Sequence, residues 1–428
     1  MRHCDVVVAG AGMTGLLTAL ALARLGAQVM LVEPVRAGGG QSGQSHGYLH
    51  RGYAYGPGEP RLPALLGSAR EHWNGLLARF TPVTAESAIV FSDTAARRRA
   101  ERFWRDCGLT VRPRATPPWL RDAPVACFQG AEPTYDIGDL LCGLWAQVRT
   151  AGIETRPGTV ERIEESGDGV CARIVEPDST AVPVRARAAV LAAGAGTPEL
   201  LARSGLPAAV QLRRAFMLVL RGRLPAVSAL FPEREEHGLF LASRIGRDGR
   251  VTWLASDFQS FDSGDAHPGQ LAGWWARRLL LTLRQVVDPA VLAEVDEVSG
   301  YAATKSGLRP HSGTVAHEFG REVLGGRAVV CTPSKLTLAP LAARRAVLTV
   351  GARLGVPAAD AGWDAIPAVP PRPAPAREAW ETPAAVLHRP DLPGAVPDIG
   401  ALSRLYVTHA GKEPPCPTGI PRQSSPAG

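Results

Sequence analysis

Lysine is nearly absent from this 428-residue chain, and arginine supplies almost all of its positive charge. Lysine and arginine together number 47 against 40 acidic residues, yet lysine occurs only as Lys305, Lys335 and Lys412. The formal charge of +7 is scattered, with only short basic clusters such as residues 97–99. This distribution argues against a nucleic-acid partner and predicts that the protein attracts small anions.

Other absences narrow the class of protein. The seven cysteines show no CxxC pair and no regular spacing, and an odd, scattered set is typical of reduced thiols in a cytoplasmic protein. No apolar segment reaches the roughly 18 uncharged residues of a membrane-spanning helix, and the first residues lack the pattern of a signal peptide. Neither a metal-ligand spacing nor a nucleophile elbow occurs, so we expect no metal site.

A strand, a glycine-rich turn and a helix open the chain. Residues 5–9 hold three consecutive valines, which is typical of a buried parallel strand, and residues 16–25 predict a helix. The turn between them has the pattern G-x-G-x-x-G, formed by Gly10, Gly12 and Gly15. Such glycines permit a tight turn, close approach of a pyrophosphate and close packing of helix on strand. The helix N-terminus adds free N–H groups that attract phosphate.

A second strand over residues 29–32 ends at Glu33, 18 residues after Gly15. An acid at this place accepts hydrogen bonds from a ribose hydroxyl. The whole unit therefore predicts a dinucleotide site. Because NAD and FAD are both bound by this unit, it leaves the choice of nucleotide open.

The rest of the chain predicts further parallel segments and a separate antiparallel region. A polar, glycine-rich loop follows Glu33 over residues 38–55, as suits a chain that runs beside an extended dinucleotide. A second strand-turn-helix unit spans residues 188–201, and the closing strand begins at residue 328. The antiparallel strands are expected at residues 212–221, 238–245 and 250–258, with a covering helix at 268–287.

This ordered set resembles the D-amino-acid oxidase-like FAD oxidoreductases, which include glycine oxidase, sarcosine oxidase, glycerol-3-phosphate dehydrogenase and 2-hydroxyglutarate dehydrogenase. Besides the opening unit, the resemblance rests on GTVERI at 158–163, LAAGAG at 191–196, GLRP at 307–310 and the closing strand-turn-helix, and it covers residues 5–355. It implies an α/β, two-domain glutathione-reductase-type FAD fold. In that fold, a parallel-sheet dinucleotide-binding domain is interleaved with an antiparallel-sheet substrate domain.

The resemblance also implies domain boundaries. The FAD-binding domain would be assembled from residues 1–80, 136–205 and 300–355, and the substrate domain from residues 81–135 and 206–299. Dense proline and little periodicity over residues 356–428 predict an extended tail.

The resemblance implies FAD as the cofactor and assigns its contacts. The glycines and Glu33 would hold pyrophosphate and ribose, the polar loop would line the pyrophosphate-ribityl chain, and the turn before the last helix would meet the flavin ring. Later segments would supply a backbone contact to adenine, from Val160, and contacts beside the FAD, from Ala193 and Gly194. The implied residues are Gly10, Gly12, Gly15, Glu33, Gln41, Ser42, Gln44, Ser45, Gly47, Val160, Ala193, Gly194, Thr332, Lys335, Leu336 and Thr337.

The candidate catalytic residues are His46, His50 and Arg309. The histidines lie in the loop expected at the flavin, where each is a candidate base, a substrate contact or a backbone hydrogen-bonding group, and His50 is also a candidate flavin attachment point. Arg309 of the GLRP segment would hold a substrate carboxylate by its planar fork. Together with Arg309, the side chains of Tyr53, Tyr55 and Trp253 either line the substrate pocket or pack in the core.

The expected activity is FAD-dependent oxidation of a small amine or amino-acid-like substrate, with hydride transfer to flavin N5. The substrate is expected to be a small, anionic molecule. One alternative is oxidation of a 2-hydroxy acid or a phosphorylated alcohol, with a base such as His50. A further alternative is a flavin-binding protein without redox turnover, because the turn CTPS at 331–334 places Pro333, which has no N–H, at the expected flavin contact.

Overall fold

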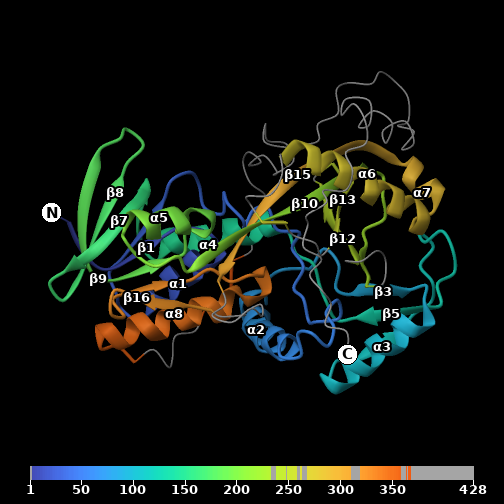
Figure 1. Ribbon diagram of the computed structural model, residues 1–428, viewed down its shortest axis with the longest axis horizontal. Helices are drawn as coiled ribbons and strands as arrows, with labels where there is room; N and C mark the ends of the chain where they lie inside the picture. The colour runs from blue at the N-terminus through green and yellow to red at the C-terminus, as the bar shows by residue number, and fades with distance from the viewer. Residues whose placement is uncertain are drawn as a thin grey trace.

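The computed structural model describes residues 2–232, 238–246, 248–257, 261–262, 268–309, 319–357, 363 and 365–367. These residues form two sheets, one largely parallel and one largely antiparallel, each with helices packed on it (Figure 1). The arrangement confirms the predicted α/β fold with a parallel sheet and an interleaved antiparallel sheet. None of the described helices is both long and apolar enough to cross a membrane.

The first sheet has the strand order β16-β17-β9-β1-β2-β6, and a meander of β7 and β8 attaches to β9. Strands β1, β2, β6, β9 and β17 pair in parallel. The side chains of residues 6–9, 29–32, 188–191 and 328–330 in these strands are buried because both faces of the sheet are covered there. The strands are β1 (Arg2–Ala9), β2 (Val29–Glu33), β6 (Glu154–Pro157), β7 (Thr159–Ser166), β8 (Gly169–Val175), β9 (Ala181–Leu191), β16 (Arg321–Val323) and β17 (Ala328–Val330).

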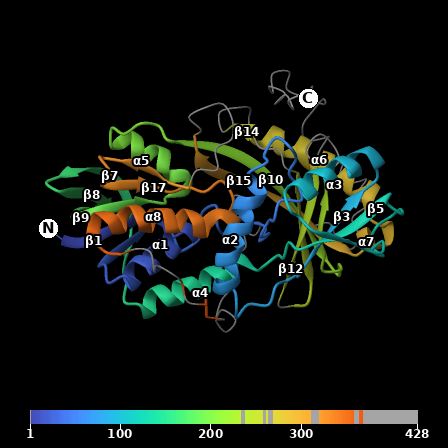
Figure 2. The same ribbon diagram turned by 90° about the horizontal axis from the view of Figure 1, so that it is seen from below.

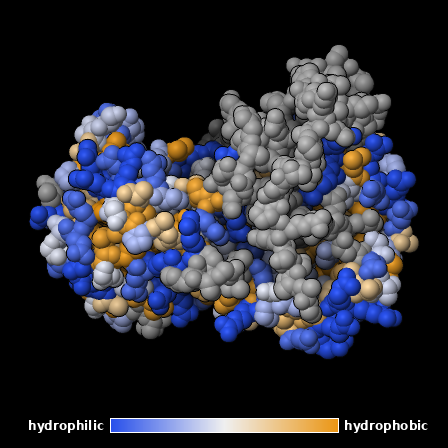
Figure 3. Space-filling view, in the orientation of Figure 1, coloured by the Kyte–Doolittle hydropathy of each residue, from blue (hydrophilic) through white to orange (hydrophobic). Residues whose placement is uncertain are grey.

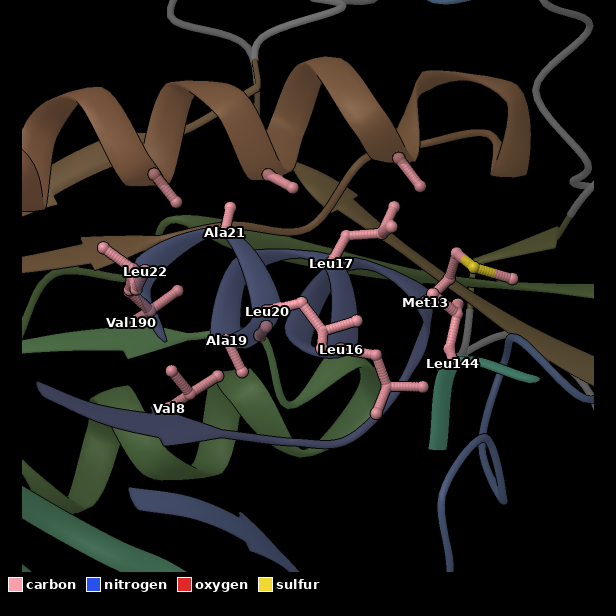
Figure 4. Close-up of a cluster of buried hydrophobic side chains, with 14 of the residues drawn as sticks. Val8, Met13, Leu16, Leu17, Ala19, Leu20, Ala21, Leu22, Leu144 and Val190 are labelled. Carbon is pink, nitrogen blue, oxygen red and sulfur yellow. The ribbon is translucent and has the colours of Figure 1, made fainter. Parts of the chain in front are cut away.

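Helices cover one face of this sheet, and the meander with a short helix covers the other. Figure 4 shows α1 between the sheet residue Val8 and the helix α8, with Ala19 toward the sheet and Leu17 and Ala21 toward α8. Small alanines on α8 let the two helices pack closely, as the alanine-rich stretch of the sequence permits. The helices are α1 (Met13–Arg24), α2 (Leu62–Leu76), α4 (Ile137–Thr150), α5 (Thr197–Arg203) and α8 (Ala339–Leu354).

The second sheet has the order β14-β10-β13-β12-β11-β3-β5-β4, and β15 pairs with β10. Helix α6 packs on one face, and loops from the first part of the chain reach the other face (Figures 1 and 2). Its elements are β3 (Ser87–Phe91), α3 (Thr94–Asp106), β4 (Val111–Pro113), β5 (Ala126–Gly130), β10 (Val210–Gly222), β11 (Ser228–Phe231), β12 (Leu239–Ile245), β13 (Val251–Asp257), β14 (Phe261–Asp262), α6 (Pro268–Val286), α7 (Pro289–Ala293) and β15 (Val295–Leu308).

The strand β15 marks the main difference from the predicted division of the chain. We assigned residues from 300 onward to the FAD-binding domain, but β15 pairs with β10 along its whole length in the second sheet. The sequence of β15 is weakly apolar, so its strand character comes from the long antiparallel pairing with β10. The other domain boundaries stay predictions.

Part of the proline-rich segment after residue 356 is anchored to the first sheet's helices. The indole Nε1 of Trp363 donates a 2.8 Å hydrogen bond to the carbonyl of Leu17, and the N–H of Ile366 donates one of 2.8 Å to the carbonyl of Leu76. The Ile366 side chain is fully buried among α1, α2 and α4. These residues, which are in neither a helix nor a strand, pack on the body of the protein. The rest of the predicted extended or disordered tail lies outside the described residues.

The buried contact of Ile366 gives a testable expectation for stability. Replacing a buried isoleucine by alanine removes transfer free energy and leaves a cavity, which typically costs about 2–5 kcal/mol. We therefore expect Ile366→Ala to lower the free energy of unfolding by that amount, measured by urea denaturation. Exposed Val35→Ala, which removes methyl groups from the surface, is the matched control. An unchanged midpoint for Ile366→Ala would contradict the anchoring.

The surface visible in Figure 3 carries hydrophilic residues over most of its described part, with apolar residues scattered between them. Exposed large apolar side chains are few among the described residues and lie apart in the sequence: Val35, Val125, Ile245, Leu281 and Leu348.

Candidate active site

The glycine turn lies at the carboxyl end of β1, where it opens α1. Gly10 has φ +101°, and a Cβ there would lie 2.5 Å from the carbonyl oxygen of Ala192. Gly12 is the N-cap of α1, with no side-chain cap and no acidic residue in the first turn. The N-terminal end of α1 is thus lined by backbone and left positive, as a pyrophosphate requires.

Glu33 lies at the end of β2, half-buried beside this turn. Its carboxylate accepts a 2.8 Å hydrogen bond from the N–H of Ala11 and a 3.2 Å hydrogen bond from the N–H of Val35. These two contacts fix the carboxylate at the carboxyl edge of the parallel strands, next to the glycine turn. Its position there suits the ribose contact predicted from its spacing.

The polar loop after Glu33 joins the two sheets. Ser42 Oγ accepts a 2.9 Å hydrogen bond from the N–H of Met13 in α1, and Gln41 Oε1 accepts 2.9 Å bonds from the N–H and the hydroxyl of Ser306 in β15. The carbonyl of Gln44 accepts from the hydroxyl of Tyr301, also in β15. The loop is held along its length between the cofactor cradle and the second sheet.

The turn before α8 supplies a further wall of the candidate FAD site. A short 3-10 helix, η2 (Leu336–Leu338), begins after Lys335 without a side-chain cap, so its N–H groups remain available. Thr337 Oγ1 accepts a 2.9 Å hydrogen bond from the N–H of His50, which ties the polar loop to this turn. The hydroxyl of Thr332 is buried without a hydrogen-bond partner in the described structure.

The remaining predicted FAD contacts lie near this edge of the first sheet. Ala193 and Gly194 follow directly after β9. Val160 of β7 lines a cavity of about 230 Å³ together with residues of β7, β8 and α5, namely Thr159, Glu161, Val175, Gly196, Glu199, Leu200 and Arg203. Uncapped helix starts, a glycine cradle and an unpaired buried hydroxyl fit an extended dinucleotide.

Two histidines and Tyr48 form an aromatic cluster over this region. The rings of Tyr48 and His50 stack at 5.1 Å between centroids, and His46 meets both rings edge-on at 5.5 Å. Burial and the nearby lysines lower the pKa of His50 to about 3. Burial, the neighbouring His50 and nearby cations hold the pKa of His46 well below its usual range. Both imidazoles are therefore neutral near pH 7.

Three cations share this site. Lys335 places its Nζ 4.5 Å from the ring centroid of Tyr55. Burial, the charge of Lys335 and that of Arg213 lower the pKa of Lys305 to about 8. Burial and Arg213 lower the pKa of Lys335 to about 8 although Glu59 acts in the opposite direction. No ion pair within the described part of the chain joins these three cations to a carboxylate, although the charge of Glu59 acts on Lys335. A cluster of this kind favours an anionic ligand.

A buried carboxylate supports the loop beneath the histidines. Glu132 is fully buried, and its Oε1 accepts hydrogen bonds of 2.6 and 3.0 Å from the N–H groups of Arg51 and Gly52. The same oxygen lies 3.9 Å from His50 Nδ1. Burial raises the pKa of Glu132 despite these donors. The carboxylate shapes the chain immediately after His50.

Two of the predicted substrate contacts are packed as core side chains. Trp253 is fully buried on the α6 side of the second sheet, where its indole donates to the carbonyl of Pro225, so its proposed place in the pocket is corrected. Side chains alternate along a strand, and the adjacent Leu254 instead faces the histidine side. Tyr53 is core as well, because its hydroxyl donates to the carbonyl of Thr110.

Arg309 is exposed at the end of β15. Its N–H donates to the carbonyl of Ala209, and its own carbonyl accepts from Arg321. The backbone is therefore fixed while the guanidinium faces outward. The predicted carboxylate contact of Arg309 is untested, and the structure offers Lys305, Lys335 and Arg213 as more buried alternatives.

Sequence reasoning missed Tyr48, Glu132, Arg213 and Arg244. Arg244 is buried on β12 and donates a 2.8 Å hydrogen bond to the carbonyl of Ser45, in the predicted cofactor loop. Its only signal is a charged residue inside an otherwise apolar strand, and Arg213 gives the same signal in β10. No three His, Cys, Asp or Glu side chains gather as metal ligands would within the described ranges.

Comparison with known proteins identifies the family. A model of the DAO family, described as FAD dependent oxidoreductase, matches residues 5–348. A probable FAD-dependent oxidoreductase of Pseudomonas aeruginosa strain PAO1 is 29% identical over 407 residues, which is 88% of this chain and 97% of the relative. Its crystal structure matches with a TM-score of 0.61 and 24% identity, over 89% of this chain and 98% of that one.

Two further solved structures share the fold. Glycine oxidase from Geobacillus kaustophilus matches with a TM-score of 0.63 and 19% identity, over 82% of this chain and 95% of its own. L-α-glycerophosphate oxidase from Mycoplasma pneumoniae, solved with FAD bound, matches with a TM-score of 0.66 and 16% identity over the same shares of 82% and 95%. With the family match from residue 5 to residue 348, this chain belongs to the DAO family of FAD-dependent oxidoreductases, and FAD is its cofactor.

Proposed function

We propose that this enzyme oxidises a small amine that carries a carboxylate, such as an amino acid. The observation that carries the proposal is the cluster of Lys305, Lys335 and Arg213 beside two neutral histidines. FAD, when bound, would supply the acceptor for the hydride that leaves the substrate carbon. The C–H bond breaks with its electron pair, and the nitrogen lone pair forms the C=N bond of an iminium product.

The cations favour the reactive form of an amine. An ammonium group has no lone pair to give, so the substrate must lose a proton before the C–H bond breaks. Positive charges near the bound substrate lower the pKa of its ammonium group by repulsion, as they lower the pKa of Lys305 and Lys335. The same cations hold the substrate carboxylate and so fix the direction in which the C–H bond points.

The low pKa values of the two histidines argue against the hydroxy-acid alternative. Oxidation of an alcohol needs a base to take the hydroxyl proton, and a useful base has a pKa near the working pH. With a pKa of about 3, His50 is a weak base, and the pKa of His46 is also well below its usual range. A neutral imidazole instead suits a hydrogen-bonding or packing role beside an amine.

Paired substrates test the proposal. FAD-loaded protein is mixed without oxygen with amino acids and with the hydroxy acids of the same carbon skeleton, for example alanine with lactate and aspartate with malate. We expect loss of the visible flavin absorbance with an amino acid and none with its hydroxy partner. Bleaching by the hydroxy acids alone would overturn the amine assignment. A lack of bleaching by both classes, with a flavin that dithionite still reduces, would favour binding without turnover.

The lysine pKa values predict how anion binding depends on pH. A lysine with a pKa of about 8 is charged below that pH and loses its charge above it. If binding needs one charged lysine, its dissociation constant rises about 30-fold between pH 7 and pH 9.5. Both histidines stay neutral in this window, and burial holds the pKa of Tyr55 well above its usual range. Arg213 and Arg244 are the arginines beside Lys305 and the polar loop.

The measurement is a titration of FAD-loaded protein with acetate, followed by the change in the flavin spectrum at each pH. Glu59 is the acidic group that acts on Lys335. Lys335→Met should flatten the profile and weaken binding at pH 7. Affinity for acetate that stays constant from pH 6 to pH 10 would contradict a role for either lysine.

A further inference from the structure

Arg213 and Lys305 lie directly opposite each other on neighbouring strands. They are register partners in the antiparallel pair of β10 and β15. Residues in such positions have Cβ atoms about 4.5–5.5 Å apart and side chains on the same face of the sheet. Two positive side chains are thus placed side by side by the fold itself.

This face is the one that carries the histidine cluster. Alternate residues of the two strands, Met217 on β10 and Tyr301 on β15, pack in the same cluster as Tyr48. Lys305 also lowers the pKa of both His46 and His50, as a nearby positive charge does. The side chains of Arg213 and Lys305 therefore point toward the histidine cluster, whereas the neighbouring Arg214 lies on the opposite face of β10.

The pair has no neutralising partner in the described side chains. Arg213 and Lys305 each lack an ion pair there, and the Nε of Arg213 is buried without a hydrogen-bond partner. Like charges directly opposite each other destabilise a sheet. In a chain that uses lysine only three times, two of the lysines lie in this site. An anion bound between the two side chains would remove the repulsion.

Lys335 offers a second, separate position for an anion. It comes from the turn before η2 rather than from the sheet, and its Nζ lies over the Tyr55 ring. The two positions are neighbours in the fold, because a Cβ built at Gly307 of β15 would lie 3.6 Å from the Cβ of Ser334, the residue before Lys335. The charge of Lys335 also acts on Lys305, and that of Arg213 acts on both lysines. A short molecule with an acidic group at each end can therefore reach both.

We propose that the substrate is an amino dicarboxylic acid, with one carboxylate on Lys335 and the other between Arg213 and Lys305. This inference rests on the proposed amine oxidation and adds the second acidic group. Three cations together with the charge of Glu59 leave two positive charges, which two carboxylates balance and one carboxylate does not. A phosphate carries its charge on one group and fills only one of the two positions.

Binding of unreactive acids to FAD-loaded protein tests the proposal without catalysis. The probes are acetate, malonate, succinate and inorganic phosphate, each titrated by the change in the flavin spectrum. We expect malonate or succinate to bind at least tenfold more tightly than acetate and phosphate. Dicarboxylates that bind no better than acetate, or phosphate that binds as well as the better dicarboxylate, would overturn it.

Variants locate the second carboxylate. Arg213→Ala and Lys305→Met should each reduce the advantage of the dicarboxylate over acetate to less than threefold. Arg214→Ala removes the same charge from the adjacent position of β10 and should keep the full advantage. An advantage that survives both Arg213→Ala and Lys305→Met would overturn the assignment.

Two outcomes separate this inference from the proposed function. If aspartate and alanine bleach the flavin equally well and malate and lactate do not, amine oxidation stands and the second acidic group is wrong. If malate bleaches it and aspartate does not, the dicarboxylate site stands and amine oxidation fails. Asp262 of β14 is the register partner of Arg213 on its other side. Asp262→Asn should leave the dicarboxylate advantage intact, and loss of that advantage would overturn the role given to Arg213.

Discussion

Gly12→Val is expected to give a folded protein that contains no FAD. Gly12 caps the N-terminal end of α1 with ordinary extended backbone, φ −73° and ψ 179°. A Cβ there would meet only the hydroxyl of Ser42, at 3.1 Å, among the protein's own atoms. The branched valine would instead occupy the space in front of the helix, where the pyrophosphate must approach.

The two neighbouring glycines are expected to behave differently. A Cβ at Gly15 would overlap the carbonyl oxygen of Gly10, and a Cβ at Gly10 would lie 2.5 Å from that of Ala192. These contacts are with backbone, which cannot move aside without breaking the strand-helix packing. Gly15→Val should therefore lose its fold as well as its FAD.

The measurement is the ratio of FAD to protein after purification, together with the circular dichroism of the apoprotein. Gly75→Val is the matched control, because Gly75 is exposed on α2 and a Cβ there meets nothing within 4 Å. It should keep a full complement of FAD. Normal FAD content in folded Gly12→Val would mean that the pyrophosphate lies elsewhere.

The opening unit was predictable because its signals are local. Three consecutive valines, the spaced glycines and Glu33 predicted β1, α1 and β2, and the structure has all three with Glu33 at the end of β2. The strand periodicity and glycine spacing act over fewer than 35 residues, so they do not depend on distant packing. The family comparison then confirmed FAD, which the unit alone left open.

The antiparallel part was harder to predict because its strands depend on distant partners. β15 contains serine, threonine, lysine and glycine and has no strong periodicity, and it becomes a strand through pairing with β10. Placing Trp253 in the pocket failed for the same reason. Which face of a strand meets the site is decided by register, and a shift of one residue exchanges Trp253 for Leu254.

The cation cluster could not be read from the sequence either. Lys305 and Arg213 are 92 positions apart and meet only through the register of β10 and β15. Arg309 was chosen from its GLRP motif, and the residue is exposed at the end of β15. Its role as the carboxylate contact stays a prediction, whereas the cluster of Arg213 and Lys305 depends on strand register, which the motif does not report.

Lys335→Met is expected to raise the apparent Michaelis constant for the amino acid by roughly 30- to 1000-fold. Removing one partner of a partly desolvated ion pair typically costs about 2–4 kcal/mol, and about 1.4 kcal/mol corresponds to a factor of ten. Methionine keeps much of the side-chain volume beside Tyr55, so the substitution tests charge rather than packing. Lys335→Arg should recover part of the loss, because the charge returns with a different shape.

The comparison with Arg309→Ala decides whether the substrate carboxylate is bound by Arg309, as the GLRP motif predicts, or by Lys335, as we propose. Because Arg309 is exposed and Lys335 lies within the site, we expect Arg309→Ala to raise the Michaelis constant by a smaller factor than Lys335→Met does. Arg214→Ala, on the other face of β10, controls for the loss of one positive charge. FAD content should be normal in all three variants, so that the constants report substrate binding. A larger effect of Arg309→Ala would restore the GLRP arginine as the carboxylate contact and would remove Lys335 from that role.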